Sequence, residues 1–94
     1  MRHYILVRYH EQVMGREALC AEISSLFARA LLLPGIEDVR VHPAVIESPG
    51  RYDLMIVMQM KREALPVFDA SPIHLEWKER FARFLDAKAI FDCE

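Results

Sequence analysis

RYDLMIVMQM, residues 51–60, is the stretch that decides the fold, because apolar residues recur in it with a plain period of two. Side chains alternate between the two faces of a β-strand, so this period predicts a strand. One face carries Tyr52, Leu54, Ile56, Met58 and Met60. The other face is polar at both ends but apolar at Met55 and Val57, so the middle of the strand needs cover on both sides. We therefore expect a strand in the centre of a sheet.

Three other segments are predicted to form strands. Residues 2–9 alternate in the same way and are apolar on both sides in the middle, which predicts a second central strand. Residues 36–47 have a weaker pattern and contain Pro43, which has no backbone N–H to donate, so this strand is expected at an edge. Residues 88–93 are predicted to complete the sheet.

The apolar spacing changes to that of an amphipathic helix in three segments. The first is residues 15–33, which ends before Pro34-Gly35 and has the apolar face Leu19, Ile23, Leu26, Phe27, Ala30 and Leu31. A short helix is expected at about residues 62–70. Ser71 followed by Pro72 is a helix-start signal. The helix it begins carries His74, Trp77, Phe81, Phe84 and Leu85 on one face, and we expect Asp86-Ala87 to end it.

The predicted order of elements is strand, helix, strand, strand, two helices, strand, which is the ferredoxin-like split βαβ arrangement of the α+β class. Right-handed crossovers place the strands at 2–9 and 51–60 side by side in the centre of a four-stranded antiparallel sheet. Both crossover helices then cover the same face of that sheet. The sequence has no linker or repeat, so residues 1–94 are expected to form a single domain.

The opposite face of the predicted sheet is also apolar, and no element of this chain remains to cover it. Met55 and Val57 belong to that face, together with their neighbours on the strand at 2–9. An uncovered apolar patch of this kind marks an interaction surface. We therefore expect a homodimer that joins the two helix-free sheet faces and forms a dimeric α/β barrel.

Composition and charge exclude several classes of partner. The net charge of −2 and the scattered lysines and arginines give no basis for nucleic-acid binding. The first eight residues contain too short an apolar run for a signal peptide, and no stretch is long enough for a membrane span, so we expect a cytoplasmic protein. Cys20 and Cys93 are then expected to be reduced thiols.

Five segments of the chain resemble those of one known family. They are HYILVRYHE (3–11), LPGIEDVRV (33–41), PGRYDLMIVMQMKREAL (49–65), SPIHLEWKERFARFL (71–85) and IFDCE (90–94). The family is the stress-responsive A/B barrel domain (Dabb) family of the dimeric α+β barrel superfamily. The most specific segment is SPIH, which resembles the family's HPxH with Ser71 in the place of the first histidine.

The resemblance implies a ligand pocket between the helices and the sheet. His74 resembles the base of the plant polyketide cyclases of the family, and His3 resembles a second histidine of the family, near the start of the first strand. The tyrosines that accompany the base correspond to Phe68 and Leu26, which have no hydroxyl group, so we expect no efficient polyketide cyclisation. Besides His74, the expected pocket residues are His3, Leu26, Phe27, Leu54, Ile56, Phe68, Trp77, Phe81 and Asp92.

Two roles are open for His74. It stands at the third position of its helix, where the partial positive charge of the helix N-terminus disfavours a protonated ring. A neutral imidazole in a pocket can act as a general base. Alternatively, His74 is a structural residue held by a backbone group or by Asp92.

Neither a metal nor a cofactor is expected. The sequence has no HxH, HExxH or CxxC motif, and a metal site would require His3, His74 and Asp92 to meet in space. Its three glycines form no Gly-rich nucleotide loop.

Three functions remain compatible with the sequence. The favoured one is a dimeric module that binds a hydrophobic small molecule between the helices and the sheet. The second is a cofactor-free enzyme of the cyclase, lyase or monooxygenase type with His74 as its base. The third is an assembly module whose only activity is the dimer contact. An open cavity beside His74 distinguishes the first two from the third.

Overall fold

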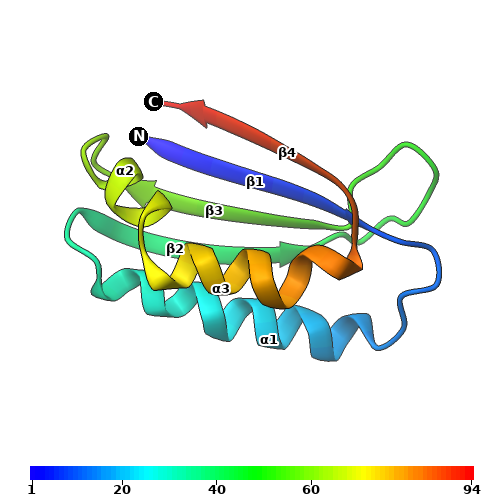
Figure 1. Cartoon of the computed structure of the whole chain (residues 1–94). Coiled ribbons are helices and arrows are strands. Elements are labelled where there is room, and N and C mark those ends of the chain that lie inside the picture. Colours follow the sequence, from blue (N-terminus) through cyan, green and yellow to red (C-terminus); the bar gives the residue numbers. More distant parts are fainter.

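The computed structural model describes all 94 residues as four strands, three α-helices and two short 3₁₀ segments (Figure 1). The elements in chain order are β1 (Arg2–Tyr9), α1 (Arg16–Ala28), β2 (Ile36–Pro43), β3 (Leu54–Met60), α2 (Ala64–Asp69), α3 (Pro72–Phe81) and β4 (Leu85–Cys93). The 3₁₀ segments follow α1 and α3 directly, at Arg29–Leu32 and Ala82–Phe84. No helix is both long enough and apolar enough to cross a bilayer.

The strands form one sheet in the order β2-β3-β1-β4, and every neighbouring pair is antiparallel. Ile5 in the centre of β1 lies opposite Ile56 of β3 on one side and Ile90 of β4 on the other. Arg2 pairs with Cys93, so the two ends of the chain lie side by side (Figure 1). The predicted α+β, ferredoxin-like sheet with the first and third strands in its centre is confirmed.

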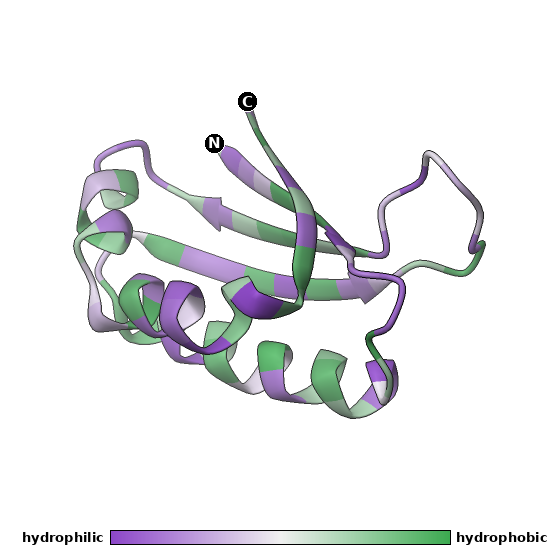
Figure 2. Cartoon of the chain, turned by 45° about the vertical axis from the view of Figure 1, so that its right-hand side comes forward, coloured by the Kyte–Doolittle hydropathy of each residue, from purple (hydrophilic) through white to green (hydrophobic).

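The core lies between the sheet and the helices, which all cover one face (Figure 1). Apolar and polar residues alternate along β1 and β3, as the bands of colour in Figure 2 show. The helix side of β1 and β3 is therefore almost closed to solvent, with Val7, Ile56, Met58 and Met60 fully buried. Facing them are Ile23 and Phe27 of α1, Phe68 of α2, and Trp77 and Phe81 of α3.

The helix-free face carries a patch of six side chains from three strands, which we call the sheet patch: Tyr4, Leu6, Met55, Val57, Ala89 and Phe91. The strand register joins them into one surface, because Tyr4 lies between Val57 and Phe91 and Leu6 lies between Met55 and Ala89. Phe91 is 61% exposed. The structure thus has the bare apolar face that the sequence predicts.

Most element boundaries differ from the predicted ones by a few residues. The first helix loses its regular α-helical hydrogen bonding after Ala28, and the 3₁₀ segment that follows turns Leu31 outward, so the predicted burial of Leu31 was wrong. The edge strand ends at Pro43 instead of continuing to residue 47, because proline cannot donate to the ladder. The central strand begins at Leu54, where pairing with β1 starts.

The prediction that Asp86-Ala87 ends the last helix was wrong, because both residues belong to β4. The α-helix stops at Phe81, and the chain joins the sheet at Leu85. Pairing with the far end of β1 favours this early entry, since Leu85 lies opposite Tyr9. The main-chain N–H of His10 also donates to the carbonyl oxygen of Phe84 at 3.0 Å.

Candidate functional site

The turn between α2 and α3 positions His74. Ser71 is the N-cap of α3, and its hydroxyl accepts a hydrogen bond from the main-chain N–H of His74 at 3.3 Å. The same hydroxyl donates to the carbonyl oxygen of Phe68 at 2.7 Å. Pro72 occupies the first helical position, where a missing N–H has no cost. The Ser-Pro pair therefore sets the direction of α3 and the place of the histidine on it.

The imidazole of His74 is held by the backbone of the same turn. Its Nδ1 lies 3.1 Å from the main-chain carbonyl oxygen of Asp69. A carbonyl oxygen can only accept, so Nδ1 carries the hydrogen and donates it. In the neutral ring, Nε2 then has a free lone pair that can accept a proton. The ring of Phe68 packs edge-on against this imidazole, with 5.3 Å between the ring centroids.

His74 is less basic than an ordinary histidine. Burial lowers its pKa below the usual value of 6.5, and the positive charge of Lys78 lowers it further. The charge and the carbonyl group of Asp69 act in the opposite direction. The lowered pKa has the direction expected from the sequence, but burial, and not the helix N-terminus, is its largest cause. The neutral form of His74 therefore predominates at pH 7.

A second histidine forms a pair with an aspartate. The Nδ1 atom of His3 lies 2.5 Å from Oδ1 of Asp92, with which it is paired across β1 and β4. A carboxylate accepts, so the Nδ1–H group of His3 is the donor. The side chain of His3 is 6% exposed and that of Asp92 is 37% exposed, so the pair reaches from the core to the surface.

A pocket of about 230 Å³ joins these groups. It lies between the α2–α3 turn and the strands β1 and β4, and its walls are His3, Ile5, Leu65, Asp69, His74, Trp77, Lys88, Ile90 and Asp92. Four predicted site residues meet here: His3, His74, Trp77 and Asp92. We call this the His74 pocket.

The other predicted pocket residues do not line it. Leu26, Phe27, Ile56, Phe68 and Phe81 are at most 2% exposed and fill the space between the helices and the sheet. Aromatic contacts close that space: the Phe27 ring lies 5.1 Å from Trp77 and 6.1 Å from Phe68. Leu54 lies at the opposite end of the sheet, in a different pocket.

Sequence reasoning missed several residues of the His74 pocket. Asp69 contributes a backbone carbonyl group, which leaves no signal in a sequence. Lys88 and Ile90 alternate with Asp92 along β4 and so share its face of the strand. That period of two could have identified them. Leu65 and Ile5 supply apolar walls and carry no chemical signal.

This arrangement can bind a small molecule and accept a proton from it. The Nε2 atom of His74 is a base of fixed tautomer, and the Lys88 ammonium group in the same pocket can stabilise negative charge on a ligand. No three His, Cys, Asp or Glu side chains are arranged to hold a metal ion.

Comparison with known proteins shows similarity in structure. A dimeric ferredoxin-like protein of unknown function from Thermobifida fusca has a TM-score of 0.77 and 15% sequence identity, and the match covers 96% of this chain and 85% of that one. A Dabb family protein with a ferredoxin-like fold from Mesorhizobium loti has a TM-score of 0.71 and 14% identity, with coverages of 99% and 93%. Hydroxynitrile lyase from Passiflora edulis has a TM-score of 0.74 and 14% identity, with coverages of 96% and 87%.

No family model and no curated protein matches the sequence. The matches to solved structures span nearly the whole chain at low identity, which is a likeness of fold. They agree with the resemblance to the Dabb family that the five sequence segments indicate. This chain therefore has the ferredoxin-like fold shared by the dimeric proteins and the Dabb protein to which it is similar.

Proposed function

We propose that the protein is a homodimeric Dabb-type protein that binds a small molecule in the His74 pocket, with His74 as a proton acceptor toward it. The observation that carries the proposal is the hydrogen bond from Nδ1 of His74 to the carbonyl oxygen of Asp69. Because Nδ1 donates its hydrogen to this carbonyl oxygen, Nε2 carries no hydrogen in the neutral ring and is its basic atom.

The surroundings of the imidazole support a role as a base. A base works best when its pKa lies near or below the working pH, because its neutral form then predominates. Burial lowers the pKa of His74, so little of it is protonated at pH 7. A purely structural role would require only the Asp69 hydrogen bond, and it would not account for a pocket beside the ring.

The pocket favours a small ligand of mixed polarity over the hydrophobic one that the sequence suggests. At roughly 30 Å³ per water molecule, its 230 Å³ hold about seven or eight water-sized groups. Ile5, Leu65 and Ile90 offer apolar contact, and the two histidines and Lys88 offer polar contact. A small alcohol, aldehyde or ketone fits this lining, and a polyketide chain is too large for it.

Homodimerisation is the second part of the proposal. The sheet patch is apolar and lies on the face that no helix covers. The similar proteins from Thermobifida fusca, Bacteroides fragilis and Jannaschia are described as dimeric. Stable interfaces bury about 1,600 Å² in total, which a four-stranded sheet face can supply. Two copies packed by their sheet patches would complete a dimeric α/β barrel.

Because the fold is similar to that of hydroxynitrile lyase, we would test lyase activity first. Such an enzyme could use Nε2 of His74 to remove the hydroxyl proton of a small cyanohydrin, while Lys88 offsets the charge of the cyanide that leaves. Proton transfer to His74 and departure of cyanide leave a carbonyl compound, so the atoms balance without a cofactor.

The experiment is a protein-observed NMR screen of small alcohols, aldehydes, ketones and cyanohydrins with the ¹⁵N-labelled dimer. Binding in the His74 pocket should shift the amide signals of Leu65, Asp69 and Ile90. The shifts should be lost in a folded His74→Ala variant and kept in His42→Ala, which changes an exposed histidine of β2. Hits whose affinity does not depend on His74 would contradict the proposal.

A further inference from the structure

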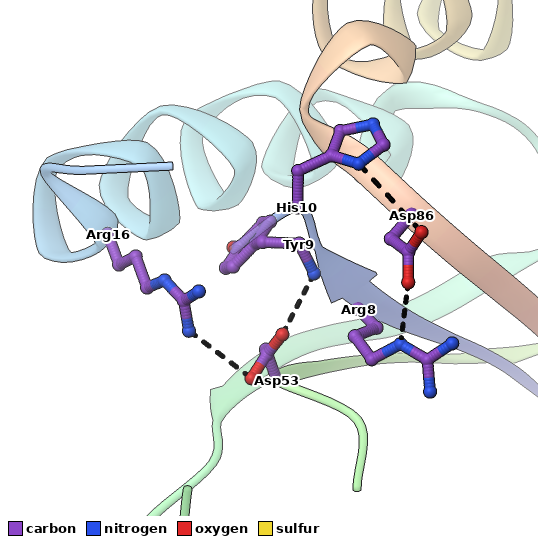
Figure 3. A network of polar contacts seen from close by, with 6 residues as sticks. All are labelled: Arg8, Tyr9, His10, Arg16, Asp53 and Asp86. Carbon is purple, nitrogen blue, oxygen red and sulfur yellow. Dashed lines mark hydrogen bonds and ion pairs between the residues drawn. The ribbon is translucent and has the colours of Figure 1, made fainter. Parts of the chain in front are cut away.

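Tyr9 and His3 are buried side chains of β1, and each has a polar atom without a hydrogen-bond partner. Figure 3 shows Tyr9 at the end of the strand, beside Arg16 of α1 and Asp53. The hydroxyl oxygen of Tyr9 is fully enclosed, so no ligand reaches it, and it is the only enclosed side-chain N or O atom that is unpaired. Nε2 of His3 is also unpaired, so it must be accessible.

The accessible Nε2 atom belongs to a side chain that is otherwise buried. The side chain of His3 is only 6% exposed. His3 and Ile5 lie on the helix side of β1 and line the His74 pocket. Buried polar groups are nearly always paired, so an unpaired ring nitrogen at the wall of a pocket points to a ligand.

The hydrogen bonding of His3 repeats that of His74. Nδ1 of His3 donates to the carboxylate of Asp92 at 2.5 Å. Nδ1 of His74 donates to the main-chain carbonyl oxygen of Asp69 at 3.1 Å. In each ring, Nε2 points away from the partner of Nδ1. Both imidazoles contact the ring of Phe68, with centroid distances of 6.4 and 5.3 Å, so one small pocket has two imidazole rings on its walls.

A hydroxyl group suits both Nε2 atoms. It donates to a bare nitrogen, as in His74, and accepts from a protonated one, so it matches His3 in either protonation state. A hydroxyl oxygen that has donated its hydrogen keeps lone pairs, and the ammonium group of Lys88 in the same pocket can donate to them. Ile5 and Leu65 offer apolar walls to the carbon atoms of such a ligand.

We propose that the ligand of the His74 pocket is a small vicinal diol, with one hydroxyl group on Nε2 of His74 and the other on Nε2 of His3. The inference rests on the proposed function and adds to it the class of ligand and a second residue that selects it. The pocket holds about seven or eight water-sized groups, which a cyclopentane ring with two hydroxyl groups fills. A ligand with a single hydroxyl group leaves one Nε2 atom unpaired, and polar sites discriminate against such a ligand.

The test compares cis-cyclopentane-1,2-diol with cyclopentanol in NMR titrations of the full ¹⁵N-labelled protein. The diol should shift the amide signals of Leu65, Asp69 and Ile90. It should bind about five- to tenfold more tightly than cyclopentanol, because it makes one more hydrogen bond. In a long-range ¹H–¹⁵N spectrum of the histidine rings, the diol should shift the Nε2 signals of both His3 and His74.

The His3→Asn variant separates the ligand contact from the pair with Asp92. The amide NH₂ group of asparagine can replace the Nδ1–H donor, but no group remains at the place of Nε2. The diol should then bind no more tightly than cyclopentanol, whose own affinity should not change. His42→Asn, which changes an exposed histidine of β2, should keep the preference for the diol. If His3→Asn does not fold, the Nε2 signal of His3 in the wild-type protein decides the matter.

The inference is overturned if cyclopentanol binds as tightly as the diol, if the diol leaves the Nε2 signal of His3 unshifted, or if a folded His3→Asn variant keeps the preference. It is also overturned if neither probe binds. Cyclopentanol binding that is lost in His74→Ala, with no gain for the diol, would remove this inference alone and leave the proposed function standing. The proposed function itself fails only if no molecule of its wider screen binds through His74, so the two failures are distinguishable.

Discussion

The hydroxyl of Ser71 accepts the main-chain N–H of His74 at 3.3 Å, and this contact ties the start of α3 to the end of α2. The Ser71→Ala variant loses this cap and the hydrogen bond to Phe68. We expect the free energy of unfolding to fall by about 1–3 kcal/mol, measured by urea denaturation. Ser25→Ala, on the exposed side of α1, should change it by less than about 0.5 kcal/mol. Equal stability of the two variants would mean that the cap contributes nothing.

Gly35 and Gly50 form a matched pair for a backbone test, because both have positive φ, +85° and +83°. A Cβ atom at Gly50 meets open space, so Gly50→Ala should lower the free energy of unfolding only through the strain of the left-handed backbone, by about 1–2 kcal/mol. A Cβ atom at Gly35 would stand 3.0 Å from the Cβ atom of Ala64. Gly35→Ala should therefore cost about 1 kcal/mol more than Gly50→Ala in thermal or urea unfolding. A cost equal to that of Gly50→Ala would show that α2 moves aside freely.

The dimer prediction is tested by sedimentation equilibrium. The wild type at micromolar concentration should have twice the chain mass of 11.0 kDa. Val57→Asp places a charge in the sheet patch and should give a monomer or an unfolded chain, because a buried unpaired charge costs several kcal/mol. Val67→Asp makes the same change on α2, where the residue is 41% exposed, and should remain dimeric. A monomeric wild type contradicts the prediction at once.

The pKa of His74 makes a prediction about stability at acidic pH. Because the folded-state pKa lies below the ordinary value of 6.5, the unfolded chain takes up a proton first as the pH falls. Stability should therefore decrease from pH 7 downward, until the pH passes the folded-state pKa. His74→Gln should lose less stability than the wild type over that range in urea unfolding at a series of pH values. Parallel curves for the two proteins would show that His74 does not titrate abnormally.

Much of the fold could be predicted because its determinants are local and periodic. The alternating residues from Leu54 to Met60 predict a strand that is buried on one face, and β2 ends at Pro43, which cannot donate a hydrogen bond to the next strand. The start of β4 was missed because Asp86 and Ala87 look like a helix end locally. Their pairing with β1 is a long-range contact, which propensity does not encode.

The candidate site could be predicted only in part. His3, His74 and Asp92 carry side chains with recognisable chemistry, so the sequence was enough to predict them as site residues. The sequence did not reveal that Phe27 and Phe68 fill the space between helices and sheet, because whether large side chains line or close a cavity depends on their packing. A pocket of about 430 Å³ at the end of β1, lined by Tyr9, Arg16 and Asp53 among others, was also missed, since its polar groups come from segments far apart in the chain.

The tautomer of His74 tests the central claim most directly. A long-range ¹H–¹⁵N spectrum of the histidine rings at pH 7, with the His74 signals assigned by their loss in His74→Ala, reports which ring nitrogen carries hydrogen. The proposed role as a base requires a protonated Nδ1 and a bare Nε2, as the contact with the Asp69 carbonyl implies. A ring protonated on Nε2 alone, or on both nitrogens, would leave Nε2 without a lone pair to accept a proton and would contradict the account.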